Sequence, residues 1–278
     1  MAPYIPEFRP MRSFILNDVR SDNDRPKFFR WLYKQHVPES ISQFMPYCTK
    51  YCTYHALPLP ADALDFGTYN MVMTEHYWLF NTFQSDSSAH SSGLVFGEEY
   101  PEDFMEMTRQ PPSDVLRQSG WQGSRDGYHP LVYVFAPVFW EDDFKGAGRF
   151  TDAGVNVRWL FFFSYPEWIS PVEGDSWFRD VFAPEVCSNG EVTRFVSSRV
   201  LDEPRINPFH RVCEVWFEDS EAWHKAMVEK ADQYTQPPWA KWEKFPFFEP
   251  FKDFVGVFIL DRPESDHLQQ WRGYITTR

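Results

Sequence analysis

A nine-residue phrase occurs twice in this 278-residue chain, about half a chain length apart. Residues 31–39 read WLYKQHVPE, and residues 177–185 read WFRDVFAPE. Trp, Pro and Glu recur at identical spacing, but His36 in the first copy corresponds to Phe182 in the second. An internal repeat of this kind constrains the fold more than any single residue does. The difference between the copies indicates which half carries chemistry.

The repeat extends well beyond this phrase. Residues 49–60 and 193–204 share a threonine, a basic residue, an aromatic residue, a leucine and a closing proline in the same order. Further matched segments are 74–78 with 219–223, 110–112 with 236–238, and 132–135 with 255–258. This colinear order predicts two copies of one unit, residues 1–150 and residues 151–278, called here the first and second halves.

Each half is expected to run strand, helix, strand, strand, helix, strand, from its apolar and β-rich segments and its capping residues. In the first half the strands are predicted at 11–16, 49–57, 68–74 and 131–136, with helices from Asp24 and over 75–83. In the second half they are predicted at 155–163, 193–201, 211–217 and 254–260, with helices from Asp175 and over 220–230. Each first helix is expected to end at its Val-Pro or Ala-Pro step, because proline disfavours helix in the preceding residue.

The βαββαβ order is that of the ferredoxin-like split unit, whose antiparallel sheet has helices on one face only. The open face must be covered, and two copies in one chain can cover each other. We therefore expect an α+β fold in which two ferredoxin-like βαββαβ repeats are fused into one α+β barrel. The first half also carries an insertion at about 84–104, Ser-rich and then Glu-rich. A loop of this length is either a lid or disordered.

Composition limits the classes of partner. Hydrophobic residues make up 43% and aromatic residues 19% of the chain, which suits a folded core and an apolar cavity. The formal net charge of −13 argues against nucleic acid and against anionic membranes as partners. The sequence shows no secretory leader and no apolar run approaching the ~20 residues of a membrane span, so a cytoplasmic protein with four reduced cysteines is expected.

The segment Phe28-Phe29-Arg30-Trp31, followed by His36-Val37-Pro38, resembles the signature of EthD-type proteins, in which an aromatic-rich first helix ends in His-x-Pro. That family belongs to the dimeric α+β barrel superfamily. The resemblance implies a tandem fusion of both barrel halves, with His36 pointing toward a substrate cavity. The superfamily includes cofactor-free decarboxylases, cyclases, isomerases and monooxygenases as well as haem enzymes, so the fold alone assigns no reaction.

Three residues are the catalytic candidates. His36 is expected to act as general acid and base, because an imidazole exchanges protons near neutral pH. Alternation along the second strand places Tyr51, Thr53 and His55 on one face, where Tyr51 and His55 would position a substrate oxygen. The alternatives are a structural His36 that binds a backbone carbonyl at the helix end, and a strand-end His55 in water.

A further group is expected to bind the substrate. Glu75 and His76 would form an acid–base pair with His36, or would only begin a helix. Tyr69 and Tyr133 would donate hydrogen bonds to a developing enolate or phenolate, or would only pack. Trp31 is interpreted as core or cavity wall.

Neither a cofactor nor a metal is expected. A haem would need an axial histidine, for which His210 and His224 are the candidates, but neither lies in a recognisable haem motif. The sequence shows no local cluster with metal-ligand spacing, no glycine-rich phosphate loop and no G-x-S-x-G motif.

The leading hypothesis is a cofactor-independent lyase, cyclase or isomerase of secondary metabolism or aromatic catabolism. It would act on a hydrophobic, aromatic or polyketide-like small molecule by His-mediated proton transfer. The alternatives are a non-catalytic small-molecule binding protein, a haem protein and a cofactor-free monooxygenase. The protein is expected to be either a monomer, in which the two halves form a pseudo-dimer, or a homodimer.

Overall fold

The computed structural model describes residues 11–17, 23, 25–44, 48–78, 136–146, 156–200 and 209–269. Their strands form a ten-stranded sheet in the order β10-β2-β4-β1-β5-β7-β8-β6-β9-β3. The strands are β1 (Met11–Asn17), β2 (Cys48–His55), β3 (Thr68–Tyr69), β4 (Val72–Trp78), β5 (Ala136–Lys145), β6 (Val157–Phe163), β7 (Val192–Val200), β8 (Arg211–Phe217), β9 (Phe254–Leu260) and β10 (Ser265–Asp266). The expected α+β class is confirmed.

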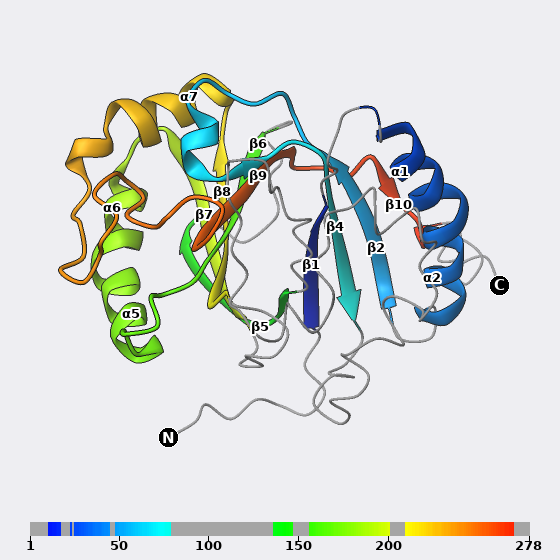
Figure 1. Cartoon of the computed structure of the whole chain (residues 1–278), viewed down its shortest axis with the longest axis horizontal. Coiled ribbons are helices and arrows are strands. Elements are labelled where there is room, and N and C mark those ends of the chain that lie inside the picture. The colour runs from blue at the N-terminus through cyan, green and yellow to red at the C-terminus, as the bar shows by residue number, and fades with distance from the viewer. Residues whose placement is uncertain are drawn as a thin grey trace.

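The helices lie outside the strands, on two opposite sides of the molecule (Figure 1). In the first half, α1 (Arg25–Trp31), the π turn η2 (Leu32–His36) and α2 (Val37–Phe44) follow one another, and a 3-10 turn η3 spans Ala63–Phe66. In the second half the helical segments are α5 (Pro171–Trp177), η5 (Phe178–Phe182), α6 (Ala183–Ser188), α7 (Ser220–His224), η6 (Lys225–Glu229) and η7 (Ala231–Gln233). Each sheet therefore has a helical layer on its outer face, and η3 of the first half packs in the layer of the second half, where Phe66 lies against Trp223. No helix in the described ranges is long and apolar enough to cross a bilayer.

Both halves have ferredoxin-like strand order. The four-strand sets β2-β4-β1-β5 and β7-β8-β6-β9 each place the first strand between the third and the fourth. Antiparallel pairing of β5 with β7 joins the two sets. Each set is extended at its outer edge by a short strand from the other half: β3 pairs with β9, and β10 pairs with β2. The Leu57 amide also donates to the Phe258 carbonyl at 2.8 Å, which brings the end of β2 onto β9 and closes the barrel.

The second strand of each half carries a bulge at the same place. The register shifts between Cys48 and Lys50 in β2 and between Val192 and Arg194 in β7. The bulged Thr49 donates from Oγ1 to the Tyr77 carbonyl at 3.1 Å. Thr193 makes the same bond to the Trp216 carbonyl at 3.0 Å. A bulge leaves one residue outside the ladder, and here the hydroxyl of that residue donates a hydrogen bond to a backbone carbonyl of the partner strand. The shared bulge aligns the two sheets residue by residue.

The first helix of each half does not end at its proline, so that prediction is wrong. The helices continue to Phe44 and Ser188 through the π turns η2 and η5. A proline in an α-helix clashes with the carbonyl four residues earlier. That carbonyl belongs to Lys34 in the first helix and to Asp180 in the second, and both residues lie within the wide π turn.

Other boundaries also differ from expectation. The helix predicted to open at Asp175 begins at Pro171, because the Ser170 hydroxyl caps it by accepting from the Glu173 amide at 3.2 Å. The strand predicted at 68–74 is two strands, β3 and β4, and β4 runs on to Trp78. The helix predicted from Glu75 is therefore wrong as far as Trp78, because β4 pairs with β1 on one side and with β2 on the other.

Five predicted elements of the second half are confirmed within a few residues. They are β6, β7, β8, β9 and the helix over 220–230, which is α7 with η6. The strand predicted at 131–136 lies outside the described residues except for Ala136, where β5 begins. The insertion at 84–104 lies wholly outside them.

Candidate functional site

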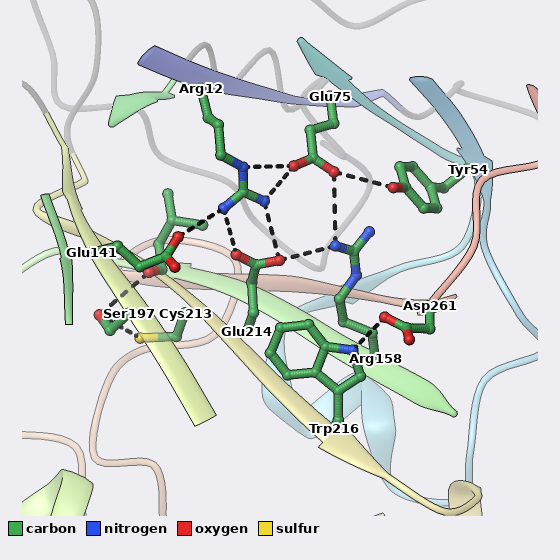
Figure 2. A network of polar contacts seen from close by, with 11 residues as sticks. Arg12, Tyr54, Glu75, Glu141, Arg158, Ser197, Cys213, Glu214, Trp216 and Asp261 are labelled. Carbon is green, nitrogen blue, oxygen red and sulfur yellow. Dashed lines mark hydrogen bonds and ion pairs between the residues drawn. The ribbon is translucent and has the colours of Figure 1, made fainter. Parts of the chain in front are cut away.

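A quartet of charged side chains, Arg12, Glu75, Arg158 and Glu214, meets between strands of the two halves (Figure 2). Arg12 and Glu75 come from β1 and β4, and Arg158 and Glu214 come from β6 and β8. Arg12 Nε donates to Glu75 Oε1 at 2.7 Å, and its Nη1 donates to Glu214 Oε1 at 2.9 Å. Arg158 Nη1 donates to the other Glu214 oxygen at 2.9 Å. This charge quartet joins the two sheets across their inner faces.

The quartet is suited to holding the barrel together and not to exchanging protons. Burial alone would lower the pKa of Arg12, but the charges of Glu214 and Glu75 raise it above its usual value. Burial alone would likewise lower the pKa of Arg158, but Tyr54, Glu75 and Glu214 raise it above its usual value. Both guanidinium groups therefore stay charged. Removing one member of such a buried network leaves an uncompensated charge, so the quartet is a structural contact whose loss is costly.

Acid–base groups gather instead between the helices and the sheet of the first half. Alternation in β2 turns Tyr51, Thr53 and His55 toward the helices, as the sequence predicts. We call this group the histidine layer; its members are Trp31, Tyr33, His36, Ser40, Tyr51, Thr53, His55, His76 and His267. Four of the eight histidines of the chain lie in it.

His36 is the partly buried base of the layer. It is the last residue of η2, and the π turn brings it back over Trp31, with ring centroids 4.5 Å apart and planes 15° apart. Ser40 Oγ lies 3.4 Å from its Nε2. Burial lowers the pKa of His36 to about 4, so its imidazole is neutral at pH 7.

Tyr51 and His76 form the floor of the layer. They are cross-strand partners in β2 and β4, with ring centroids 4.4 Å apart, and each is 2% exposed. Ser40 hydrogen-bonds Tyr51 as well as approaching His36, so it links the floor to the partly exposed base. Burial raises the pKa of Tyr51. Burial, followed by His36 and His267, lowers the pKa of His76 to about 3. Tyr51 therefore stays protonated and His76 stays neutral.

His55 lies at the rim of the layer. Its Nε2 is 2.6 Å from the Tyr33 hydroxyl. Burial, and then the charge of Glu264, raises the pKa of Tyr33 to about 12. The rim thus offers a neutral phenol and an imidazole within hydrogen-bond distance of each other.

The structure brings five of the eight predicted residues together, namely Trp31, His36, Tyr51, His55 and His76. Tyr69 and Glu75 lie on the inner face of the barrel, Tyr69 against Phe251 at 5.2 Å and Glu75 in the quartet. Adjacent strand residues point to opposite faces, so Glu75 cannot join His76 beside His36. Tyr133 lies outside the described residues.

Sequence reasoning missed Tyr33, Ser40 and His267. Ser40 is four residues after His36, and this helical spacing is a signal that could have found it. His267 has no local signal, because its place depends on the pairing of β10 with β2.

The corresponding layer of the second half lacks these groups. The matched bulges and registers pair Ser13 with Trp159, Tyr51 with Phe195 and His76 with Val215, and the sequence repeat pairs His36 with Phe182. Phe182 stacks on Phe178 at 5.6 Å within an aromatic core. The charge quartet, in contrast, is kept in both halves, with Arg12 matching Arg158 and Glu75 matching Glu214. The halves share a barrel interior and differ in their outer layers.

The two candidate haem ligands do not fit that role. His210 Nδ1 accepts from the Tyr165 amide at 3.0 Å, and its ring lies against the Tyr165 ring. His224 Nε2 lies 3.1 Å from Asp62, and its Nδ1 lies 3.6 Å from Glu229. Among the residues that the structure describes, no group of three or more His, Cys, Asp or Glu side chains is arranged to hold a metal ion.

Comparisons with known proteins give one family model and a set of solved structures. Residues 8–113, more than a third but less than half of the chain, match the chalcone isomerase N-terminal domain. No curated protein matches. An EthD family protein from Bacillus halodurans is 20% identical over 26% of this chain and 72% of its own, with a TM-score of 0.23. A mutant chlorite dismutase from Candidatus Nitrospira defluvii is 10% identical over 91% of this chain and 92% of its own, with a TM-score of 0.44.

Proposed function

We propose that this protein is a cofactor-independent enzyme of the cyclase or isomerase type, with His36 as general acid and base. The observation that carries the proposal is the neutral imidazole of His36, partly exposed above the buried Tyr51 and His76. The match to the chalcone isomerase N-terminal domain supports it, because residues 8–113 include these three residues. The substrate class is a hydrophobic, aromatic small molecule with an acidic hydroxyl.

Ring closure of a hydroxychalcone illustrates the reaction. His36 takes the proton of the substrate phenol, and the phenolate oxygen bonds to the β-carbon of the conjugated ketone. The electrons of the C=C bond move onto the carbonyl, and the α-carbon of this enolate then takes a proton from the imidazolium. One O–H bond and one C=C bond are lost while one C–O and one C–H bond form. The product is an isomer, so the step needs no oxidant. General acid–base catalysis of this kind is worth about 10²- to 10⁴-fold in rate.

The burial of each residue divides the roles. His36 is partly exposed and meets the substrate, whereas Tyr51 is buried and orients His36 through Ser40. His55 and Tyr33 at the rim bind a substrate oxygen. Residues 1–150 are then the working half, and residues 151–278 support it.

The test uses 2′-hydroxychalcone as the probe and follows the loss of its long-wavelength absorbance. His36→Ala should lower kcat/KM by at least about 100-fold, while circular dichroism shows a folded protein. His224→Ala is the matched control, because His224 lies in the second half against Asp62, and it should keep the wild-type rate. A folded His36→Ala variant with wild-type turnover would overturn the proposal.

A non-catalytic binding protein is the second candidate, favoured by the deep burial of Tyr51 and His76. It predicts that the wild type binds the probe, as measured by quenching of tryptophan fluorescence, and forms no product. It also predicts equal affinity in His36→Ala. An oxygen electrode in the same reaction separates both candidates from a monooxygenase, which would consume oxygen.

A further inference from the structure

We propose that His267, carried by β10 from the far end of the chain, is a positioning residue that holds Tyr51 and Thr53 in the histidine layer. This inference rests on the proposed function of that layer. It makes the site a composite, because the second half supplies a side chain to the working half.

The side chain of His267 is fixed by direct contacts. Its Nε2 lies 2.8 Å from Thr53 Oγ1. Its ring meets the Tyr51 ring edge-on, with centroids 5.1 Å apart and planes at 71°. The centroid of the Tyr33 ring lies 6.0 Å from that of His267. His267 is therefore near both the floor residue Tyr51 and the rim residue Tyr33.

The backbone around His267 is fixed as well. Ser265 and Asp266 pair with Thr53 and Cys52 of β2. The His267 amide donates to the Tyr51 carbonyl at 2.8 Å, and the Glu264 amide donates to the Thr53 carbonyl at 3.1 Å. These bonds hold the histidine and the three residues before it along β2. Its ring is thus placed by a strand ladder and not by a free terminus.

The contacts identify what His267 does for the layer. It touches Tyr51, and Tyr51 is linked through Ser40 to His36. Loss of the imidazole leaves Tyr51 without its edge contact and Thr53 without its partner. The charges of His36 and His267, when protonated, also lower the pKa of His76. A shift of Tyr51 would therefore reach both His76 and the catalytic base.

The test compares His267→Ala with His267→Gln, because the glutamine amide can still reach Thr53 Oγ1. With 2′-hydroxychalcone, His267→Ala should lower kcat by about 10- to 100-fold and leave KM near the wild-type value, since the residue orients the base and does not touch substrate. His267→Gln should recover most of that loss. His224→Ala, which lies in the other half, should change neither constant.

A second readout does not depend on turnover. Side-chain ¹H–¹⁵N spectra of the full-length protein, recorded against pH, should show the titration midpoint of His76 rising in His267→Ala. An unchanged midpoint together with an unchanged kcat overturns the positioning role, even if His36→Ala is inactive. If the wild type has no activity on the probe, the proposed function fails and the His76 titration alone decides the role of His267.

Discussion

At the scale of single residues, burial keeps His36 and His76 in their basic form. The pKa of His36 falls to about 4 and that of His76 to about 3, chiefly because burial penalises the charged imidazole. At pH 7 both imidazoles are therefore unprotonated. The same burial makes the fold sensitive to acid.

The pH dependence of stability follows from that shift. An unfolded histidine titrates near ~6.5, so between pH ~6.5 and ~4 the unfolded chain binds a proton that His36 in the folded chain does not. The free energy of unfolding should therefore fall as pH is lowered through this window, by up to about 1.4 kcal/mol per pH unit for each such histidine. Urea unfolding of His36→Gln between pH 7 and 5 should show a free energy of unfolding that depends less steeply on pH than in the wild type. The difference in slope should correspond to the uptake of about one proton. An unchanged slope would contradict the neutral, buried state of His36.

The residues of the site were predictable only where the signal is local. His36 differs from its partner in the repeat, and Tyr51 and His55 share a face through strand alternation, so the sequence could propose all three as candidates. His267 could not be found in this way, since β10 reaches the layer by pairing with a strand more than 200 residues away in the chain.

At the scale of elements, the helix starts and ends show how side chains override simple rules. The sequence predicted a helix opening at Asp175, but Ser170 caps it earlier and Asp175 bonds Arg211 from within the helix. The sequence also predicted breaks at the two prolines, which the π turns avoid. Neither π turn has a pattern in the sequence that marks it.

Cap removal tests where this helix begins. Ser170→Ala should cost about 1 kcal/mol in the free energy of unfolding, because the Glu173 amide loses its acceptor. Ser176→Ala is the matched control in the same helix, because that exposed hydroxyl only bonds back to the Val172 carbonyl, and it should change stability by less than about 0.5 kcal/mol. Equal effects in urea titrations would show that Ser170 does not cap the helix.

At the scale of the whole molecule, the charge quartet joins the two sheets. The sequence predicted two ferredoxin-like units that cover each other, and the barrel has that form. The exchange of β3 and β10 between the halves was not predictable, because each strand is two residues long and depends wholly on its partner strand. The quartet was missed for the same reason, since its members are single charges on four separate strands.

Breaking the quartet should destabilise the protein strongly. Glu214→Gln leaves Arg12 and Arg158 short of a buried counter-charge, which should cost about 3–5 kcal/mol in the free energy of unfolding. Glu249→Gln removes an exposed partner of Lys252 by the same change and should cost less than about 1 kcal/mol. If chemical unfolding shows similar losses of stability in the two variants, the quartet is not the main polar contact between the sheets.

The difference between the halves provides the most direct test of the working site. His36→Phe installs the residue that the second half already carries at this position, Phe182, within the same π turn and above an equivalent tryptophan. The variant should therefore fold, with a melting temperature at or above that of the wild type, and be unable to transfer a proton.

The decisive measurement is kcat/KM of folded His36→Phe on 2′-hydroxychalcone beside the wild type. A loss of at least about 100-fold is predicted. A folded variant that retains turnover within about threefold of the wild type would contradict the assignment of catalysis to His36 and to the histidine layer.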